Sequence, residues 1–301
     1  MKLRLRLRQE GAATLDAHSK LMLQMQRIVS PSLVLIFAVL ACTVPNADAA
    51  SFQIAVLGDG WGAATAREIR AITLSAADEI ARNVPRTRIG TIVVYHRDDH
   101  PLTAWERTPD GKISVGLQAR DRQCAQIAFQ FAHEFCHVLI THSGDSRRTP
   151  RTPGGANLWL EESLAETASL FALHAMSRSW ERSAPFRGWR SYAPEFSDYA
   201  QNRMRSADAG GRSDFTRWFG KNEPAMRRNA ELRDSNLVVA LQLLPLFEAE
   251  PRGWEAVTFM HPAAHDPRQP LGAFLAEWRQ NCPPTLRPFV TGIAAVFGIA
   301  M

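Results

Sequence analysis

The stretch AHEFCHVLITH, residues 132–142, places two histidines four positions apart around a glutamate in an otherwise apolar segment. Apolar residues recur here with helical spacing, so we expect a helix over residues 120–142. Positions i and i+4 share one face of a helix, so His133 and His137 present their imidazoles to one point, with Glu134 beside them. The opposite stripe of this helix, which should pack against a sheet, consists of Ile127, Phe131, Phe135 and Val138.

Two imidazoles at this spacing suit a zinc ion, which binds histidine nitrogens at about 2.0–2.1 Å. A catalytic zinc keeps three protein ligands and leaves the fourth position to water, so a third ligand is needed. A third histidine six residues after His137, with a glycine three residues after His137, is excluded because those positions are Ser143 and Ile140. His142 is one residue out of place. We therefore expect one Zn²⁺ per chain, completed by a residue from a later segment.

A later segment, ANLWLEESLAETASL at residues 156–170, supplies glutamates. Its LWLEESLA part resembles the W-L-x-E-G-x-A segment of the aminopeptidase-type gluzincin metallopeptidases, and the resemblance covers about residues 50–175. It implies that Glu162 is the third zinc ligand, that Glu161 occupies the variable place and that Ser163 replaces a glycine. It also implies a zinc metallopeptidase with Glu134 as general base. The sequence has no G-x-M-E-N-like segment, which weakens an exopeptidase interpretation.

Further site residues are expected around this core. Glu166 lies one helical turn beyond Glu162 on the same face, so we expect its carboxylate to accept the outer N–H of a zinc-bound histidine. The tetrahedral oxyanion of peptide hydrolysis needs another hydrogen-bond donor. The resemblance suggests a tyrosine or histidine after the third ligand, so Tyr192, Tyr199 and His174 are all candidates.

The pattern along the chain predicts an α+β fold. We expect a small mixed β-sheet with helices, including the HExxH helix, followed by a mainly α-helical C-terminal subdomain, as in a zincin-like fold. The expected parts are a leader at 1–49, an α+β subdomain at 50–145 and a helical subdomain at 146–301. Strands are predicted at 52–57, 88–96, 102–108 and 112–118, and further helices at 63–83, 157–178, 234–249 and 271–280.

The strands at 102–108 and 112–118 flank Asp110-Gly111, a hairpin turn signal. We expect the second of these strands, KISVGLQ, to lie at an edge of the sheet. An edge strand can pair with an extended peptide, so the expected partner is a peptide or protein substrate.

Residues 1–49 have the features of a signal peptide. The apolar core SLVLIFAVLACTV follows Arg27 and precedes Ala47-Asp48-Ala49, a small-x-small cleavage signature. We therefore expect an exported protein, periplasmic or secreted, that meets a membrane only if Cys42 is lipidated or the leader stays uncleaved. Cleavage would lower the net charge from +5 to +2, so we expect no nucleic-acid partner.

Two other functions compete with the peptidase. GDGWGA, residues 58–63, matches a dinucleotide-binding fingerprint and would suit a nucleotide-binding oxidoreductase, but the hairpin that follows does not fit a doubly wound sheet. The second competing function is a non-catalytic zincin fold that binds zinc or a peptide. It is left open because Ser163 replaces the glycine and because no oxyanion donor can be assigned. Among the cysteines, Cys136 is expected to pack in the core, and Cys124 and Cys282 form either a disulfide or two buried thiols.

Overall fold

The computed structural model describes residues 51–301 except residue 86 and residues 144–154, 208–213 and 261–267. The leader predicted at 1–49 and Cys42 lie outside the described residues. All described residues belong to one compact unit that spans Asp48–Met301. Within this part of the chain, each helix is too short or too polar to cross a membrane.

The first half of the unit alternates strands with helices in the predicted order. The elements are β1 (Ser51–Val56), α3 (Ala66–Ala81), β2 (Arg88–His96), β3 (Leu102–Thr103), β4 (Ile113–Leu117) and α4 (Cys124–His142). β2 has the predicted bounds, and α4 starts four residues later than predicted. The local apolar patterns therefore predict the order of these elements well.

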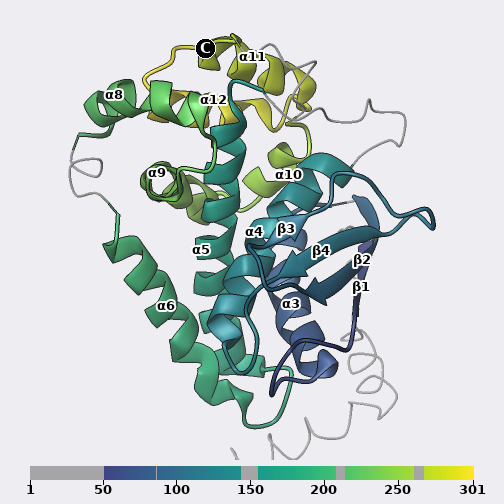
Figure 1. Ribbon diagram of the computed structural model, residues 1–301. Coiled ribbons are helices and arrows are strands. Elements are labelled where there is room, and N and C mark those ends of the chain that lie inside the picture. Colours follow the sequence, from purple (N-terminus) through teal and green to yellow (C-terminus); the bar gives the residue numbers. More distant parts are fainter. Residues whose placement is uncertain (1–50, 86, 144–154, 208–213, 261–267) are drawn as a thin grey trace, which may run out of the picture. The chain divides into compact units, whose positions relative to one another are not determined.

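The strands form one mixed sheet in the order β1-β2-β4-β3 (Figure 1). β1, β2 and β4 are parallel, and β3 is antiparallel to β4. The register aligns Ile54 with Ile92 and Ile92 with Ile113, and these three side chains are buried in one row. Helices α3 and α4 pack on the sheet. The structure is thus mainly helical with a small four-stranded mixed sheet, which is compatible with the predicted α+β class.

The prediction that KISVGLQ is an edge strand is wrong. β4 lies between β2 and β3, so both of its sides are paired, and β3 is the edge. The turn at Asp110-Gly111 forms as predicted, since Thr108 O accepts the N–H of Gly111 at 2.8 Å and Gly111 has a φ of 81°. β4 pairs with β2, and its buried side chains extend the apolar rows of that strand. Of the strand predicted at 102–108, only Leu102–Thr103 pair with β4.

The second half of the unit is helical. Its elements are α5 (Leu158–Ser183), the 3-10 helix η1 (Trp189–Tyr192), α6 (Ala193–Arg205), α8 (Phe215–Arg228), α9 (Arg233–Ala249), α10 (Gly253–Val257), α11 (Leu271–Asn281) and α12 (Arg287–Val296). α5 runs through the middle of the unit and packs against α4, α6 and α9 (Figure 1). A helix covered on several sides is buried all round. α5 thereby places its first turns against the HExxH face of α4.

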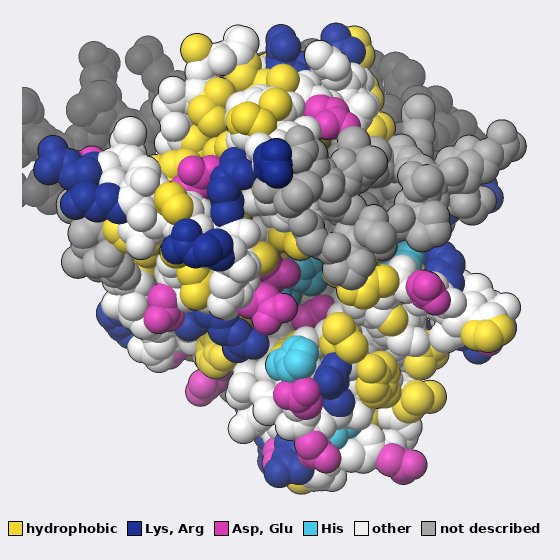
Figure 2. Space-filling model, turned by 45° about the horizontal axis from the view of Figure 1, so that its top comes forward, with side chains coloured by type: hydrophobic (Ala, Val, Ile, Leu, Met, Phe, Trp, Pro, Cys, Tyr) yellow, Lys and Arg dark blue, Asp and Glu magenta, His cyan; other side chains and the backbone are white. Residues whose placement is uncertain are grey.

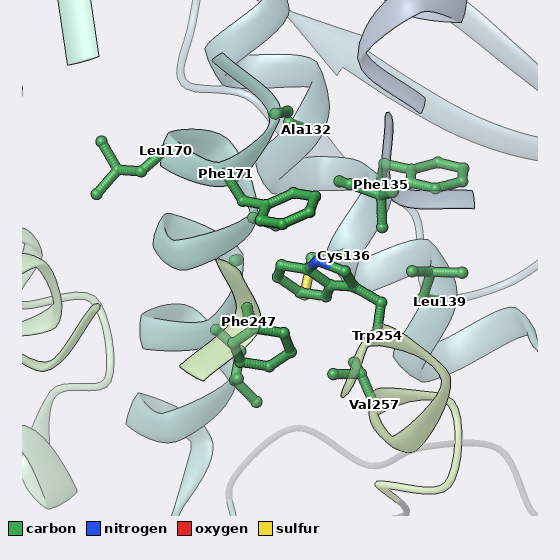
Figure 3. Packing of buried hydrophobic residues seen from close by; sticks show 14 of the residues in the cluster. Ala132, Phe135, Cys136, Leu139, Leu170, Phe171, Phe247, Trp254 and Val257 are labelled. Atoms are coloured by element: carbon green, nitrogen blue, oxygen red, sulfur yellow. The ribbon is translucent and has the colours of Figure 1, made fainter. Parts of the chain in front are cut away.

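Cys136 of α4 lies in a buried aromatic cluster and not on the histidine face. Figure 3 shows Cys136 beside Trp254, together with Phe171 and Phe247. The rings of Phe247 and Trp254 stack at 4.1 Å between centroids, and Cys136 is fully buried. The side chain therefore fills the core between α4, α5 and α10, as expected from the sequence.

Cys124 and Cys282, the other two cysteines of the described chain, are buried free thiols. The disulfide that the sequence left open is thus not formed. Burial raises the pKa of both thiols, that of Cys282 to about 12, so they stay protonated and unreactive near neutral pH.

The glycines of GDGWGA serve a tight loop between β1 and α3. Gly60 and Gly62 both have positive φ, and a Cβ on Gly60 would lie 2.8 Å from the Cβ of His96. A Cβ on Gly62 would collide with the carboxylate of Asp121, which accepts the N–H of Ala63 at 2.8 Å. In the described sheet, the parallel strands β1, β2 and β4 follow one another in chain order. The sheet therefore lacks the switch in strand order at which dinucleotides bind. Packing therefore explains these glycines without a phosphate.

Candidate metal site

A cavity of about 550 Å³ lies where β3, α4, α5, α6 and the start of α9 meet. Figure 2 shows this region as a hollow in the surface, with acidic and histidine side chains inside it. The side chains on its wall that bear on the chemistry are Thr103, His133, Glu134, His137, Glu161, Glu162, Glu166, Tyr199 and Arg203. The volume is typical of a binding site for a small molecule or a short segment of a larger one.

α4 presents its two histidines to this cavity because its opposite face is fixed in the core. Phe131 and Phe135 are fully buried, and Phe135 contacts Phe52 of β1 with ring centroids 5.4 Å apart. One turn apart, the rings of His133 and His137 lie 5.0 Å from each other. Both remain partly exposed to the cavity. The predicted pairing of the two imidazoles is therefore present in the structure.

Glu162 of α5 reaches both histidines. Its Oε2 lies 3.3 Å from Nε2 of His133, and its Oε1 lies 3.5 Å from Nε2 of His137. Two donors that are each about 2.0–2.1 Å from one tetrahedral ion lie about 3.3–3.4 Å apart. The three residues form a group whose ligand atoms all lie within 4.8 Å of one another. Two imidazole nitrogens and one carboxylate at this spacing fit a zinc ion.

Glu161 holds the other face of the His137 ring. Its Oε1 lies 2.8 Å from Nδ1 of His137, and its side chain is only 4% exposed. This contact makes Nδ1 the protonated nitrogen, so that the lone pair of Nε2 is directed toward Glu162. Two consecutive glutamates of α5, Glu161 and Glu162, therefore contact the two nitrogens of the His137 imidazole.

The contact that we predicted for Glu166 is thus made by Glu161. Glu166 accepts a hydrogen bond from Nε of Arg203 at 2.9 Å and ties α5 to α6. Consecutive helical residues point about 100° apart, which lets Glu161 and Glu162 straddle His137, whereas Glu166 is about 6 Å further along the helix axis. Arg203 itself was not predicted from the sequence, although it follows Tyr199 by four residues and shares its helix face.

Replacing Glu161 by alanine should weaken zinc binding about 10- to 100-fold, the usual effect of removing the partner of a zinc-bound histidine. The matched control is Glu166→Ala, which removes a second buried carboxylate from the same helix and should change the zinc affinity less than about twofold. Competition with a chromogenic chelator measures both dissociation constants. A larger loss in Glu166→Ala than in Glu161→Ala would restore the role first expected for Glu166.

Glu134 lies next to the three donor residues. It is 4% exposed, and its Oε2 accepts a hydrogen bond from Oγ1 of Thr103 at 2.8 Å. Its carboxylate is outside the group of three metal donors found among the described residues. Glu134 therefore shares the cavity with the three donor residues but does not belong to their group.

Of the three candidate oxyanion donors, Tyr199 alone lines the described part of the cavity. Burial raises the pKa of Tyr199, so its hydroxyl remains a proton donor at neutral pH. Tyr192 instead packs edge-on against Trp189 at 6.2 Å. His174 pairs with Glu248 of α9 through a contact of 2.7 Å. The structure thus brings only one of these three residues into the cavity that holds His133, His137 and Glu162.

Comparisons of the chain with known protein families, with curated proteins and with solved structures give no match.

Proposed function

We propose that this protein is a zinc-dependent peptidase that hydrolyses peptide bonds with the residue arrangement of a gluzincin. One observation carries the proposal: Nε2 of His133 and of His137 lie 3.3 and 3.5 Å from the two carboxylate oxygens of Glu162, with Glu134 beside them in one cavity. Three protein ligands facing a cavity are typical of a catalytic zinc, whereas structural sites use four.

A bound zinc would lower the pKa of a water molecule toward about 7 and polarise the scissile carbonyl. The carboxylate of Glu134 would take the proton from the attacking water and pass it to the nitrogen of the leaving amine, so that Glu134 ends the cycle ionised. Its near-complete burial keeps it out of bulk solvent while it does so. The chain thereby contributes both a metal-binding group and a general base.

The edge strand β3 supports a peptide substrate. β3 borders the cavity, and among the described strands none pairs with its outer side. An extended peptide can add to such an edge through main-chain hydrogen bonds. Leu102 and Trp105, at this side of the cavity, are 36% and 41% exposed and offer apolar surface to substrate side chains. We therefore transfer the peptide-pairing role, first expected for the strand at 112–118, to β3.

Tyr199→Phe should lower kcat about 10²- to 10³-fold, the range seen when one oxyanion-stabilising donor is removed, and should change KM less than about twofold. The lost group is a single hydroxyl, and phenylalanine keeps the ring that packs on Phe129. Steady-state kinetics on a fluorogenic peptide measures the effect. Tyr192→Phe, which removes a tyrosine hydroxyl outside the cavity, is the control and should keep the wild-type kcat. Equal rates for Tyr199→Phe and wild type would exclude Tyr199 as the donor.

The alternative of a non-catalytic zincin fold rests in part on Ser163. In the structure Ser163 is fully buried, and its hydroxyl donates to the main-chain oxygen of Trp159 at 2.7 Å. It is outside the set of residues that line the cavity. Packing inside the protein therefore accounts for Ser163. Its side chain does not take up space around the three metal-donor residues.

The proposal is tested by digestion of a peptide library with the mature protein. We expect cleavage that a zinc chelator abolishes and added Zn²⁺ restores. Bound zinc without cleavage would favour the non-catalytic alternative. The proposal that the protein acts after export rests on residues 1–49, and fractionation of producing cells tests it separately.

A further inference from the structure

We propose that Thr103 is the positioning residue of Glu134, a role that rests on the proposed function. Oγ1 of Thr103 lies 2.8 Å from Oε2 of Glu134 and 3.0 Å from the main-chain oxygen of the same residue. Both residues are buried, with exposed fractions of 9% for Thr103 and 4% for Glu134. The general base is thus tied to a residue 31 positions earlier in the chain.

The chemistry of the two groups decides the direction of this hydrogen bond. A hydroxyl carries one proton, and an ionised carboxylate only accepts. Of the two acceptors within reach of Thr103, the carboxylate of Glu134 is the stronger because it is charged. The bond therefore occupies Oε2, fixes the rotamer of Glu134 and leaves Oε1 as the oxygen that receives the proton of the attacking water.

Ala104, the residue that follows Thr103, is held by two contacts. Its N–H donates to the main-chain oxygen of Ser114 on β4 at 2.9 Å. Its main-chain oxygen lies 3.1 Å from Nε2 of His142, at the end of α4. The threonine hydroxyl is thus fixed relative to both the sheet and the HExxH helix. A base held by a fixed group keeps the geometry that proton transfer requires.

The place of Thr103 on the edge strand links the base to the substrate. β3 is the strand to which we propose that a peptide adds, and Thr103 is one of its two residues. A substrate aligned on β3 is therefore aligned with the strand that positions Glu134. This coupling predicts that loss of the hydroxyl affects the chemical step and leaves substrate binding intact.

Thr103→Val tests the role, because valine keeps the shape and β-branching of threonine and removes only the hydroxyl. We expect kcat to fall about 10- to 100-fold, the range for a lost hydrogen bond to a charged group, while KM and zinc content stay at wild-type values. Thr103→Ser, which restores a hydroxyl, should recover kcat to within about threefold. The matched control is Thr73→Val, in which a buried hydroxyl that donates to the main-chain oxygen of Ile69 is lost from α3.

Wild-type kcat in Thr103→Val, or an equal loss in Thr103→Ser, would overturn the positioning role. A wild-type protein that does not cleave peptides would instead overturn the proposed function. A crystal structure of Thr103→Val separates the two, because it needs no activity. We expect the carboxylate of Glu134 to leave the position that it holds in wild type, and an unchanged carboxylate would refute the role of Thr103 in either case. Thr103→Ala is the substitute if Thr103→Val does not fold.

Discussion

Glu134→Gln should lower kcat about 10²- to 10⁴-fold while one zinc per chain stays bound, because glutamine keeps the size of glutamate but cannot take a proton from water. The metal donors His133, His137 and Glu162 are unchanged in this variant, and the amide can still accept the hydrogen bond of Thr103. Initial rates on the best substrate from the peptide library, together with elemental analysis of the same sample, measure both quantities.

The matched control for Glu134→Gln is Glu79→Gln, in which another buried glutamate loses its charge. Glu79 lies on α3, 6% exposed, and pairs with Arg82. Glu79→Gln should cleave peptides at the wild-type rate once folded. A Glu134→Gln protein that retains more than about a tenth of the wild-type kcat would mean that another group acts as the base.

Glu162→Ala should weaken zinc binding about 10²- to 10³-fold. Structural zinc sites with four ligands bind with about 10–16 kcal/mol, or about 2.5–4 kcal/mol per ligand, which corresponds to roughly this loss when one ligand is removed. The alanine leaves two imidazoles on α4 with no carboxylate in place of Glu162. Chelator competition at fixed pH gives the dissociation constant, and peptide cleavage at limiting zinc should fall in parallel.

Glu231→Ala is the control for Glu162→Ala, since Glu231 is an exposed glutamate that lines the same cavity. It should bind zinc with wild-type affinity. If Glu162→Ala and wild type bind zinc equally well, the third ligand is a different residue. If neither binds zinc, the contacts of Glu162 are ion pairs between a glutamate and two histidines of α4.

The sequence predicts the elements of the first half of the chain well because their signals are local. The apolar alternation of RIGTIVVYH defines β2 to the residue, and the helical spacing around residues 124–142 defines α4. Strand pairing has no local signal of this kind. The position of β4 is decided by the apolar rows that it shares with β2, which lies on the other side of a hairpin.

In the candidate site, too, the residues with a local sequence signal are predicted and the others are not. The spacing of His133 and His137 already places them on one face of a helix, and the structure brings Glu162 to that face. The choice between Glu161 and Glu166 depends on the rotation of α5 about its axis relative to α4, which helical periodicity does not determine. Thr103 contacts Glu134 across two elements far apart in the sequence, so it gave no signal that a search along the chain could find.

The most direct test of the account is the anomalous X-ray signal of crystals of the mature protein, recorded on both sides of the zinc absorption edge. We predict one peak that appears only above the edge, about 2.0–2.2 Å from Nε2 of His133, from Nε2 of His137 and from a carboxylate oxygen of Glu162. Crystals grown with zinc present that show no peak between these three residues would contradict the account.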